Sequence, residues 1–320
     1  MALPPALRQA VETVLEGVRP AELARASATL SARYRAELQD GAWHLLSDEA
    51  ARAYLAARLP ATYAATAASL EQLAYARPDF HPKTLLDVGA GPGTVVWAVT
   101  ARWPELGAAH LLEASPVIRR YGEQLGVALP LEPLWQTADI VQGVPAAEPA
   151  DLVTLAYVLD ELTPGARTRL VGDLWALTKD VLLIVEPGTP AGYQRLLAAR
   201  DQLLGAGAHI LAPCPHAEAC PLAKPDWCHF SVRVARSRTH LQTKAAEVGW
   251  EDEKYSYLAV ARVPGARFVG RVLATPRARP GLVTLKLCQA TGEAAERVLS
   301  KRDGDAYKRA RRLGWGDTFS

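Results

Sequence analysis

The sequence predicts an α/β fold in which a doubly wound, mostly parallel sheet follows a helical N-terminal region. Four short apolar runs, typical of buried parallel strands, alternate with helix-like segments between residues 83 and 204. A glycine-rich turn joins the first of these runs to the first of these helices. The chain has 320 residues, of which 49% are hydrophobic and 22% charged, and this composition suits a globular protein with a sizeable core.

The N-terminal region, residues 1–80, is expected to be helical. Alanine and leucine are abundant, and apolar residues recur at helical spacing over 21–38 and 48–76. Ser47 is expected to cap the second stretch, and Pro60 is expected to divide or kink it.

The alternating pattern defines the predicted core, residues 81–206. Strands are expected at 83–88, 109–114, 151–158 and 180–187, and helices at 94–102, 116–125, 164–178 and 191–204. Because each strand is followed by a helix, the strands are expected to lie parallel in one sheet.

The regular order loosens after residue 206. Residues 207–262 are predicted to hold a cysteine-rich metal loop and the last core strands, with strand-like alternation over 254–262. Residues 263–320 are predicted to form a basic β-extension and tail. Within this part, 267–287 alternates like a strand and 293–312 is helix-like.

The charge is uneven along the chain. The net charge is only +2, yet residues 262–312 hold 13 lysines and arginines against 4 acidic residues. This asymmetry favours an anionic partner, although the solvated surface of an arginine-rich protein would give the same count.

The N-terminus and the hydropathy bear on the expected location. No apolar run approaches the roughly 20 residues that a bilayer span requires. The first residues lack the pattern of a secretory signal, and Glu12 and Glu16 argue against a transit peptide. The expected location is the cytoplasm, without membrane contact, and the oligomeric state stays open.

The glycine-rich turn predicts a nucleoside site. Gly89, Gly91 and Gly93 follow a strand and precede a helix, where the backbone must turn tightly and approach a ligand closely. Their spacing, G-x-G-x-G, differs from the G-x-G-x-x-G of dinucleotide binders. An acidic residue two positions earlier, Asp87, and another that ends the next strand, Glu113, are typical of S-adenosylmethionine (SAM) binding. Glu113 is expected to accept hydrogen bonds from the ribose hydroxyls.

Three more residues are expected to complete the SAM site. Asp139 lies where the loop of a third strand would flank the adenine, and Ala156 and Tyr157 follow the fourth strand and would line the methionine side. The predicted fold is therefore the Rossmann-like sheet of class I SAM methyltransferases. The alternatives are the same sheet without its ligand, and a nicotinamide-binding domain.

The sequence defines a catalyst less clearly than a cofactor site. Residues 155–162 lack the Asn/Asp-Pro-Pro-aromatic motif of enzymes that methylate base amino groups. No cysteine precedes residue 214, which excludes methylation at carbon 5 of cytosine. Asp160 and Glu161 are the candidate bases, although acidic residues at such positions often only begin a helix.

All four cysteines lie in the last third of the chain: Cys214, Cys220, Cys228 and Cys288. In a chain expected to be intracellular, such a cluster favours a metal over disulfides. The C-x2-C turn of zinc knuckles is missing, and proline follows two of the cysteines, as it does after a ligand in ferredoxin-type loops. The spacing leaves zinc and an iron–sulfur cluster open, with four ordinary cysteines as the third interpretation.

Several stretches carry a resemblance to a known family. They are LLDVGAGPGT (85–94), LVTLAYVLDEL (152–162), VEPGTPAG (185–192), CPHAEACPLAKPDWCHFSVR (214–233) and SKRDGDAYK (300–308), together with the late Cys288. The chain resembles the methyltransferase-like small-ribosomal-subunit assembly family, which includes methyltransferase-like protein seventeen of mitochondria and its fungal and bacterial relatives. The stretch with three cysteines is the most specific, and the resemblance runs from about residue 80 to the C-terminus.

The resemblance implies a [4Fe-4S] cluster on the four cysteines, in preference to zinc. It also implies binding to small-subunit rRNA in the 30S particle during ribosome assembly, and a possible rRNA methyltransferase activity. Two other functions compete: a small-molecule SAM-dependent methyltransferase, and a catalytically inactive iron–sulfur or zinc RNA-binding module.

The basic tail is the expected RNA surface, because RNA affinity depends mainly on neutralising phosphates. Tyr307, Trp227 and Trp315 are candidates for stacking on unpaired bases, although such aromatic residues more often belong to a core. The expected phosphate-binding residues are Arg297, Lys301, Arg302, Lys308, Arg309, Arg311 and Arg312.

Overall fold

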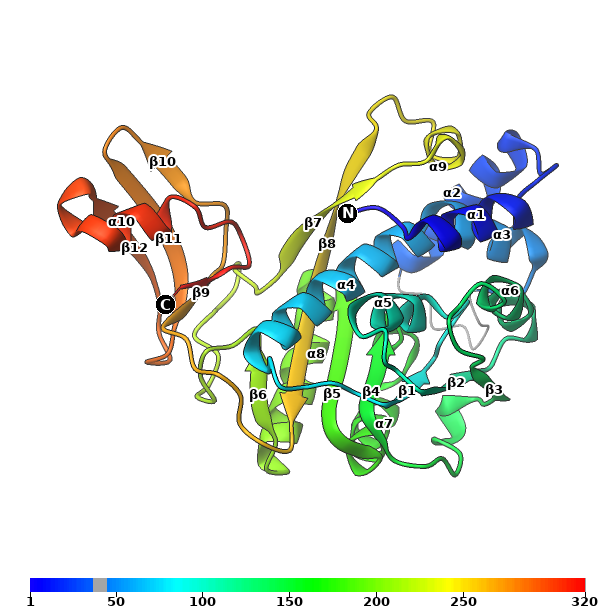
Figure 1. Cartoon of the computed structure of the whole chain (residues 1–320), viewed down its shortest axis with the longest axis horizontal. Coiled ribbons are helices and arrows are strands. Elements are labelled where there is room, and N and C mark those ends of the chain that lie inside the picture. The colour runs from blue at the N-terminus through cyan, green and yellow to red at the C-terminus, as the bar shows by residue number, and fades with distance from the viewer. Residues whose placement is uncertain (37–44, 320) are drawn as a thin grey trace.

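The computed structural model describes residues 1–36 and 45–319, which form a main sheet of eight strands and a second sheet of five (Figure 1). The order of the main sheet is β3-β2-β1-β4-β5-β8-β6, and β7 pairs with β8. Its strands are β1 (Thr84–Val88), β2 (Ala108–Glu113), β3 (Leu134–Thr137), β4 (Ala150–Ala156), β5 (Thr178–Pro187), β6 (His209–Ala212), β7 (Phe230–Ala235) and β8 (Trp250–Ala261).

The direction of the strands identifies the fold class. Strands β1 to β5 run parallel, whereas β8 runs antiparallel to both β5 and β6. A parallel sheet with this order and one reversed strand next to the edge is the class I methyltransferase sheet, so the predicted fold class is confirmed. Its switch point lies between β1 and β4, where ligands of such sheets bind at the carboxyl ends of the strands.

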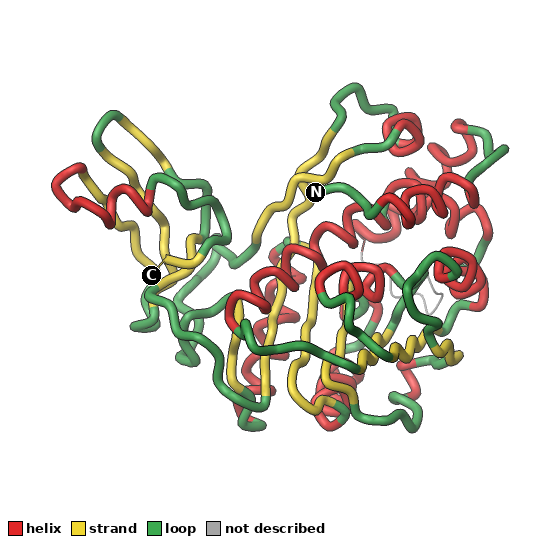
Figure 2. Tube along the Cα trace, viewed as in Figure 1, coloured by secondary structure: helices red, strands yellow, loops and turns green. Residues whose placement is uncertain are grey.

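Helices cover both faces of the main sheet (Figure 2). Helices α4 and α5 pack on one face within one apolar cluster, and α7 and α8 pack on the other face within a second cluster. The helices of the described residues are α1 (Pro5–Val14), α2 (Pro20–Ala36), α3 (Asp48–Ala57), α4 (Leu59–Ala76), α5 (Thr94–Arg102), α6 (Pro116–Gly126), α7 (Pro164–Ala176), α8 (Pro190–Gly205), α9 (Arg238–Thr243) and α10 (Gly304–Ala310). None of them combines the length and apolar composition that would span a bilayer.

The N-terminal helices begin and end largely where the sequence predicts. The Ser47 hydroxyl accepts a hydrogen bond from the Ala50 amide (3.2 Å) and caps α3. Pro60 occupies the first turn of α4, where its missing amide hydrogen costs no hydrogen bond. The helical stretch is therefore divided into α3 and α4 just before Pro60. The helix expected over 21–38 agrees with α2 as far as residue 36, and residues 37 and 38 lie outside the described residues.

Strand β8 is twelve residues long and changes character along its length. From Tyr255 to Ala261 it is buried and lies between β5 and β6. Before Tyr255 its side chains alternate between exposed and half-buried, and there it pairs with β7 in a hairpin that extends past the sheet. The apolar second half was predicted as a strand, but the polar first half was not.

The second sheet has the order β10-β11-β9-β13, with β12 paired to β11. Its apolar residues pack against Tyr307 and Ala310 of α10 and form a separate small core. The strands are β9 (Gly270–Val272), β10 (Arg277–Arg279), β11 (Leu282–Gln289), β12 (Ala294–Ser300) and β13 (Thr318–Phe319).

One predicted element of this second sheet is wrong. Residues 293–312 were expected to be helix-like, but residues 294–300 form strand β12 and only 304–310 form a helix. The local sequence of β12 has helix-forming residues, yet seven of its residues pair with β11, and that pairing outweighs local propensity. A capping box at Ser300 and Asp303 then marks the change from strand to helix.

Candidate functional site

A cavity of about 830 Å³ lies at the carboxyl ends of the parallel strands. Residues of the N-terminal helices, Tyr54, Arg58 and Thr62 among them, form part of its wall. Six of the predicted cofactor residues line it: Gly89, Gly91, Glu113, Asp139, Ala156 and Tyr157. The two candidate bases, Asp160 and Glu161, line it as well, whereas Asp87 and Gly93 lie behind its wall.

The glycine turn has a backbone that other residues rarely adopt. Gly89, Gly91 and Gly93 have φ angles of +68°, +55° and +76°. A Cβ on Gly89 would lie 2.5 Å from Val158 Cγ2, so a side chain there would collide with the wall of the cavity. A Cβ on Gly91 would meet no atom within 4 Å, and the main chain at this point is open to a ligand.

Glu113 ends β2 and is held by main-chain amides. Its two carboxylate oxygens accept hydrogen bonds from the Gly91 amide (2.8 Å) and the Ser115 amide (2.7 Å). Burial raises the pKa of this carboxyl, and the amide hydrogen bonds oppose that rise. Each oxygen retains a lone pair, so the fixed carboxylate can accept further hydrogen bonds from hydroxyls in the cavity.

Asp87 is buried beneath the glycine turn. Its Oδ1 accepts a hydrogen bond from the Thr154 hydroxyl (2.7 Å), and its Oδ2 has no partner among the described residues. Burial raises the pKa of Asp87 to about 7, and the charge of Glu113 adds to the rise. Asp87 therefore supports the turn from below, without lining the cavity.

Replacement of Asp87 by asparagine should stabilise the protein at pH 8 more than at pH 5. Because the folded-state pKa lies above the ordinary value of 3.8, ionisation destabilises the fold as the pH rises from about 4 to about 7, and the full cost remains above pH 7. We expect a gain of about 2–4 kcal/mol at pH 8, measured by chemical denaturation at both pH values. Asp305→Asn, at an exposed position, is the control. An equal effect of Asp87→Asn at both pH values would contradict the prediction.

Acidic side chains gather where β4 and β5 end. Glu186 is fully buried and accepts hydrogen bonds from Arg195 Nε (2.9 Å) and the Leu159 amide (3.1 Å). Glu161 is exposed within the cavity, yet withdrawal from bulk water and the charge of Asp160 raise its pKa to about 8. The proximity of these carboxyls therefore disfavours the ionised form of Glu161.

Tyr157 has a φ of +60°, an uncommon value for a residue with a side chain, and such strain often marks a functional site. Its hydroxyl donates to Glu253 Oε1 (3.3 Å), and the Arg58 guanidinium lies 6.0 Å from its ring centroid. Arg58 also pairs with Glu253 (3.4 Å). Sequence reasoning missed Arg58 and Glu253 because they are far apart in the chain and belong to no motif.

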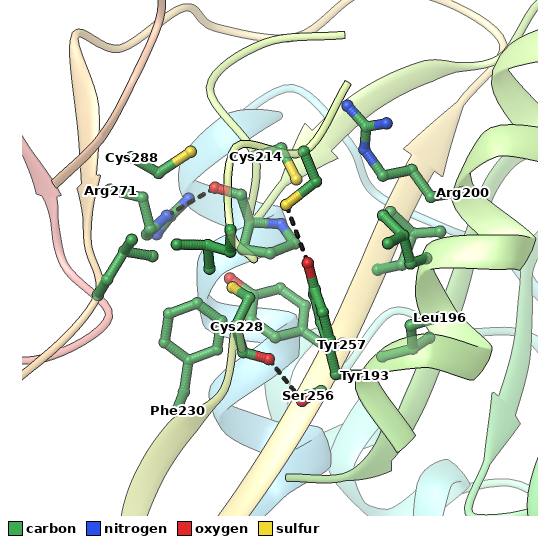
Figure 3. Close-up of a pocket in the computed structure, with 16 residues that line it drawn as sticks. Tyr193, Leu196, Arg200, Cys214, Cys228, Phe230, Ser256, Tyr257, Arg271 and Cys288 are labelled. Atoms are coloured by element: carbon green, nitrogen blue, oxygen red, sulfur yellow. Dashed lines mark hydrogen bonds between the residues drawn. The ribbon is translucent and has the colours of Figure 1, made fainter. Parts of the chain in front are cut away.

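A second, smaller cavity of about 40 Å³ is lined by all four cysteines (Figure 3). Cys214, Cys220 and Cys228 come from the segment between β6 and β7, whereas Cys288 comes from β11 of the second sheet. Cys288 Sγ lies 3.3 Å from His216 Nε2, and Cys220 Sγ lies 3.1 Å from the Tyr193 hydroxyl. The cavity therefore lies where the cysteine-rich segment and both sheets meet.

Burial affects the protonation of the thiols in this cavity. Burial raises the pKa of Cys214 and Cys228, and it raises the pKa of Cys288 to about 12. These thiols are neutral at pH 7 unless a cation replaces their protons, so metal binding here would release protons.

The spacing of the thiols bears on the kind of metal. Within the described ranges, no three His, Cys, Asp or Glu side chains are close enough together to hold one metal ion. A single zinc ion would hold its sulfur ligands about 3.8 Å apart, given Zn–S bonds of about 2.3 Å. In this arrangement the thiols therefore do not form a ready-made site for a single metal ion.

The seven predicted phosphate-binding residues are all exposed. They come from β12, from a 3-10 turn (Lys301–Asp303), and from α10 and the residues that follow it. Lys308 pairs with Asp305 (3.0 Å). Because they belong to one compact sheet and its helix, they can face a common anionic surface.

The candidate stacking residues belong mainly to the packing. Tyr307 is buried in the core of the second sheet, as the core interpretation of these aromatic residues predicts, and is not available as a base platform. The Trp227 indole donates to the Gly188 carbonyl (3.1 Å), and the Trp315 indole donates to the His229 carbonyl (2.9 Å). The imidazole of His229 lies against both indole rings.

A comparison with models of protein families identifies the family of this chain. The model of the family described as "Mitochondrial small ribosomal subunit Rsm22" matches residues 48–320. The chain belongs to the Rsm22 family. The resemblance inferred from the cysteine-rich stretch is thereby confirmed.

Relatives of this Rsm22-family chain include the human protein "Ribosome assembly protein METTL17, mitochondrial". It is 32% identical over 289 residues, which cover 82% of this chain and 61% of the human protein. A fission-yeast relative, "Rsm22-cox11 tandem protein 2, mitochondrial", is 23% identical over 89% of this chain and 45% of its own length. The chain thus spans about half to three fifths of these relatives.

Among solved structures, magnesium protoporphyrin IX methyltransferase from Synechocystis, crystallised with bound SAM, is similar in fold. The TM-score is 0.43 at 14% identity, over 74% of this chain and 93% of that one.

The expected location needs correction. The cytoplasm was predicted from the N-terminal residues, but the Rsm22 family description and both relatives above are mitochondrial. The prediction of a cytoplasmic protein is therefore wrong by this comparison. The error came from reading the absence of a simple targeting pattern as a location.

Proposed function

We propose that this Rsm22-family chain is an assembly factor of the small ribosomal subunit that binds small-subunit rRNA, SAM and a [4Fe-4S] cluster. The observation that carries the proposal is the family match over residues 48–320, together with a human relative named as a ribosome assembly protein. The two cavities and the basic second sheet are the features on which the three proposed ligands rest.

SAM binding is supported by the larger cavity. Glu113 is fixed by two amides in the position from which it can accept the ribose hydroxyls, and Gly91 leaves the main chain open beside it. SAM would supply a methyl group on a cationic sulfonium. Asp160, which lines the cavity, places a carboxyl at the other end of the cavity, where it can pair with such a cation.

Methyl transfer to rRNA is the finer part of the proposal. Asp160 and Glu161 remain the candidate bases because both line the cavity. The pKa of Glu161, raised to about 8, lies close to the pH range in which a general base is most effective.

The proposal of a cluster rests on four thiols that line one cavity, of which Cys288 is buried and the other three are half-buried. Cys214, Cys220, Cys228 and Cys288 would each hold one iron, and the apolar walls would keep water from it. The cluster would supply a rigid link between the cysteine-rich segment and β11. Zinc is the alternative metal.

The test is ultraviolet crosslinking of the full chain to RNA in cells, followed by mapping of the crosslinked nucleotides and peptides. We expect crosslinks to small-subunit rRNA, at peptides from the second sheet and α10. A variant in which a bulky residue replaces Gly91 should keep these crosslinks, because the replacement alters only the larger cavity. Crosslinks confined to other RNAs, or none above background, would disprove the proposal.

A further inference from the structure

Two buried arginines line the cysteine cavity, Arg200 and Arg271. Arg271 is only 1% exposed and Arg200 only 4%. The other lining residues among those that the structure describes are thiols, hydroxyls and apolar side chains, with no carboxylate. A cation in such surroundings is unfavourable unless an anion lies nearby.

Arg271 is adjacent to two of the cysteines, Cys288 and Cys214. It lies directly across from Cys288 in the antiparallel pair of β9 and β11. Its Nε donates to the carbonyl of Pro213 (2.9 Å), the residue before Cys214. Arg271 is therefore placed between the fourth thiol and the first.

The hydrogen bonds of Arg271 leave its charge uncompensated. Its Nη1 donates to the Gly316 carbonyl (2.8 Å) and to the side-chain amide oxygen of Gln72, and its Nη2 has no partner in the described part of the chain. Every acceptor is neutral, and beneath the guanidinium lies only the ring of Phe268. By contrast, Arg200 pairs with Asp201 (3.0 Å) at the protein surface.

We propose that Arg271 is the counter-charge of the metal centre and that the cavity is built for a dianionic group. Four thiolates around an oxidised [4Fe-4S] core carry two negative charges in total, and four thiolates around zinc carry the same. Reduction of a cluster adds a third negative charge, which the Arg271 guanidinium stabilises. Arg271 is thus a positioning residue that slows metal release and eases reduction, an inference that rests on the proposed metal centre.

The experiment compares three full-length proteins: the wild type, Arg271→Gln and Arg271→Lys. Both variants lose most of the hydrogen bonds of the guanidinium, but only the glutamine variant loses the charge. We expect Arg271→Gln to favour the oxidised cluster about tenfold, a downward shift of about 59 mV for one electron, and to lose iron faster to a chelator. Arg271→Lys should stay near the wild-type potential. Potentials are measured by redox titration under electron paramagnetic resonance.

Arg262→Gln is the matched control. Arg262 also donates to two main-chain carbonyls and lies over an aromatic ring, Trp175, but at a distance from the cavity. Should Arg271→Gln not fold, Arg200→Gln tests the same cavity, with a smaller shift expected because Asp201 already pairs with Arg200.

The outcomes separate the two proposals. A wild-type chain that is purified without iron or zinc overturns the metal centre and the counter-charge together. A loaded wild type with equal potentials and equal metal release in Arg271→Gln overturns the counter-charge alone. Equal shifts in the glutamine and lysine variants also overturn it, because they would trace the effect to lost hydrogen bonds.

Discussion

Replacement of Cys288 by serine is expected to abolish stable metal binding and to detach the second sheet from the main one. Cys288 is the one predicted ligand on the second sheet, and the other three lie in the segment between β6 and β7. A serine hydroxyl has almost the same size but does not ionise to a ligand of thiolate strength. We expect less than about a tenth of the wild-type metal content, because the binding free energy of a structural site contributes directly to folding.

The stability of the second sheet should fall with the metal. Its own core is small, so it depends on its contact with the rest of the chain. Limited proteolysis should cut Cys288→Ser between 262 and 270 far sooner than the wild type. Metal analysis by mass spectrometry and proteolysis of the same samples would measure both effects.

Thr284→Ser is the control, because it makes a small change on the same strand away from the thiols. Removal of metal from the wild type by a chelator should reproduce the proteolysis of Cys288→Ser. A serine variant with full metal content and wild-type proteolysis would exclude Cys288 as a ligand.

Replacement of Arg309, Arg311 and Arg312 by glutamate is expected to weaken binding to small-subunit rRNA by about two orders of magnitude at moderate salt. All three side chains are exposed at the end of α10. Each replacement removes a positive charge and adds a negative one, so phosphate contacts become repulsive. The slope of log affinity against log salt should flatten by about 2, since each lost phosphate contact on single-stranded RNA contributes about 0.7.

The matched control reverses three exposed arginines elsewhere, Arg8, Arg25 and Arg102. It changes the net charge equally, so it isolates position from overall charge. Filter binding to 30S particles over a salt series would measure both variants. If the two variants lose affinity equally, long-range charge explains the binding and the tail is not the contact surface.

The core of the fold could be predicted because its signals are local. The runs at 83–88, 109–114, 151–158 and 180–187 are largely buried on both faces, so each is mostly apolar, and they match β1, β2, β4 and β5. A third strand was expected before Asp139, but its bounds were not predicted, because β3 lies at the edge of the sheet, where its residues are exposed or half-buried and carry little apolar pattern.

The sequence predicted only those residues of the larger cavity that belong to a local motif. Gly91 and Glu113 belong to a motif of fixed spacing, and both line the cavity. Arg58 and Glu253 meet across the fold from distant segments, so no spacing in the sequence relates them. The same holds for Arg271, whose position beside Cys288 depends on the pairing of β9 with β11.

Strand β8 is long enough to contribute residues to both cavities. Glu253 contacts Tyr157 in the larger cavity, and three residues later the Ser256 hydroxyl donates to the Cys228 carbonyl (2.8 Å) at the smaller one. Side chains alternate along a strand, so an insertion or deletion of one residue here would turn every following side chain to the opposite side. The larger cavity and the cysteine cavity therefore depend on the same strand, so a one-residue insertion or deletion within β8 would alter the relation between them.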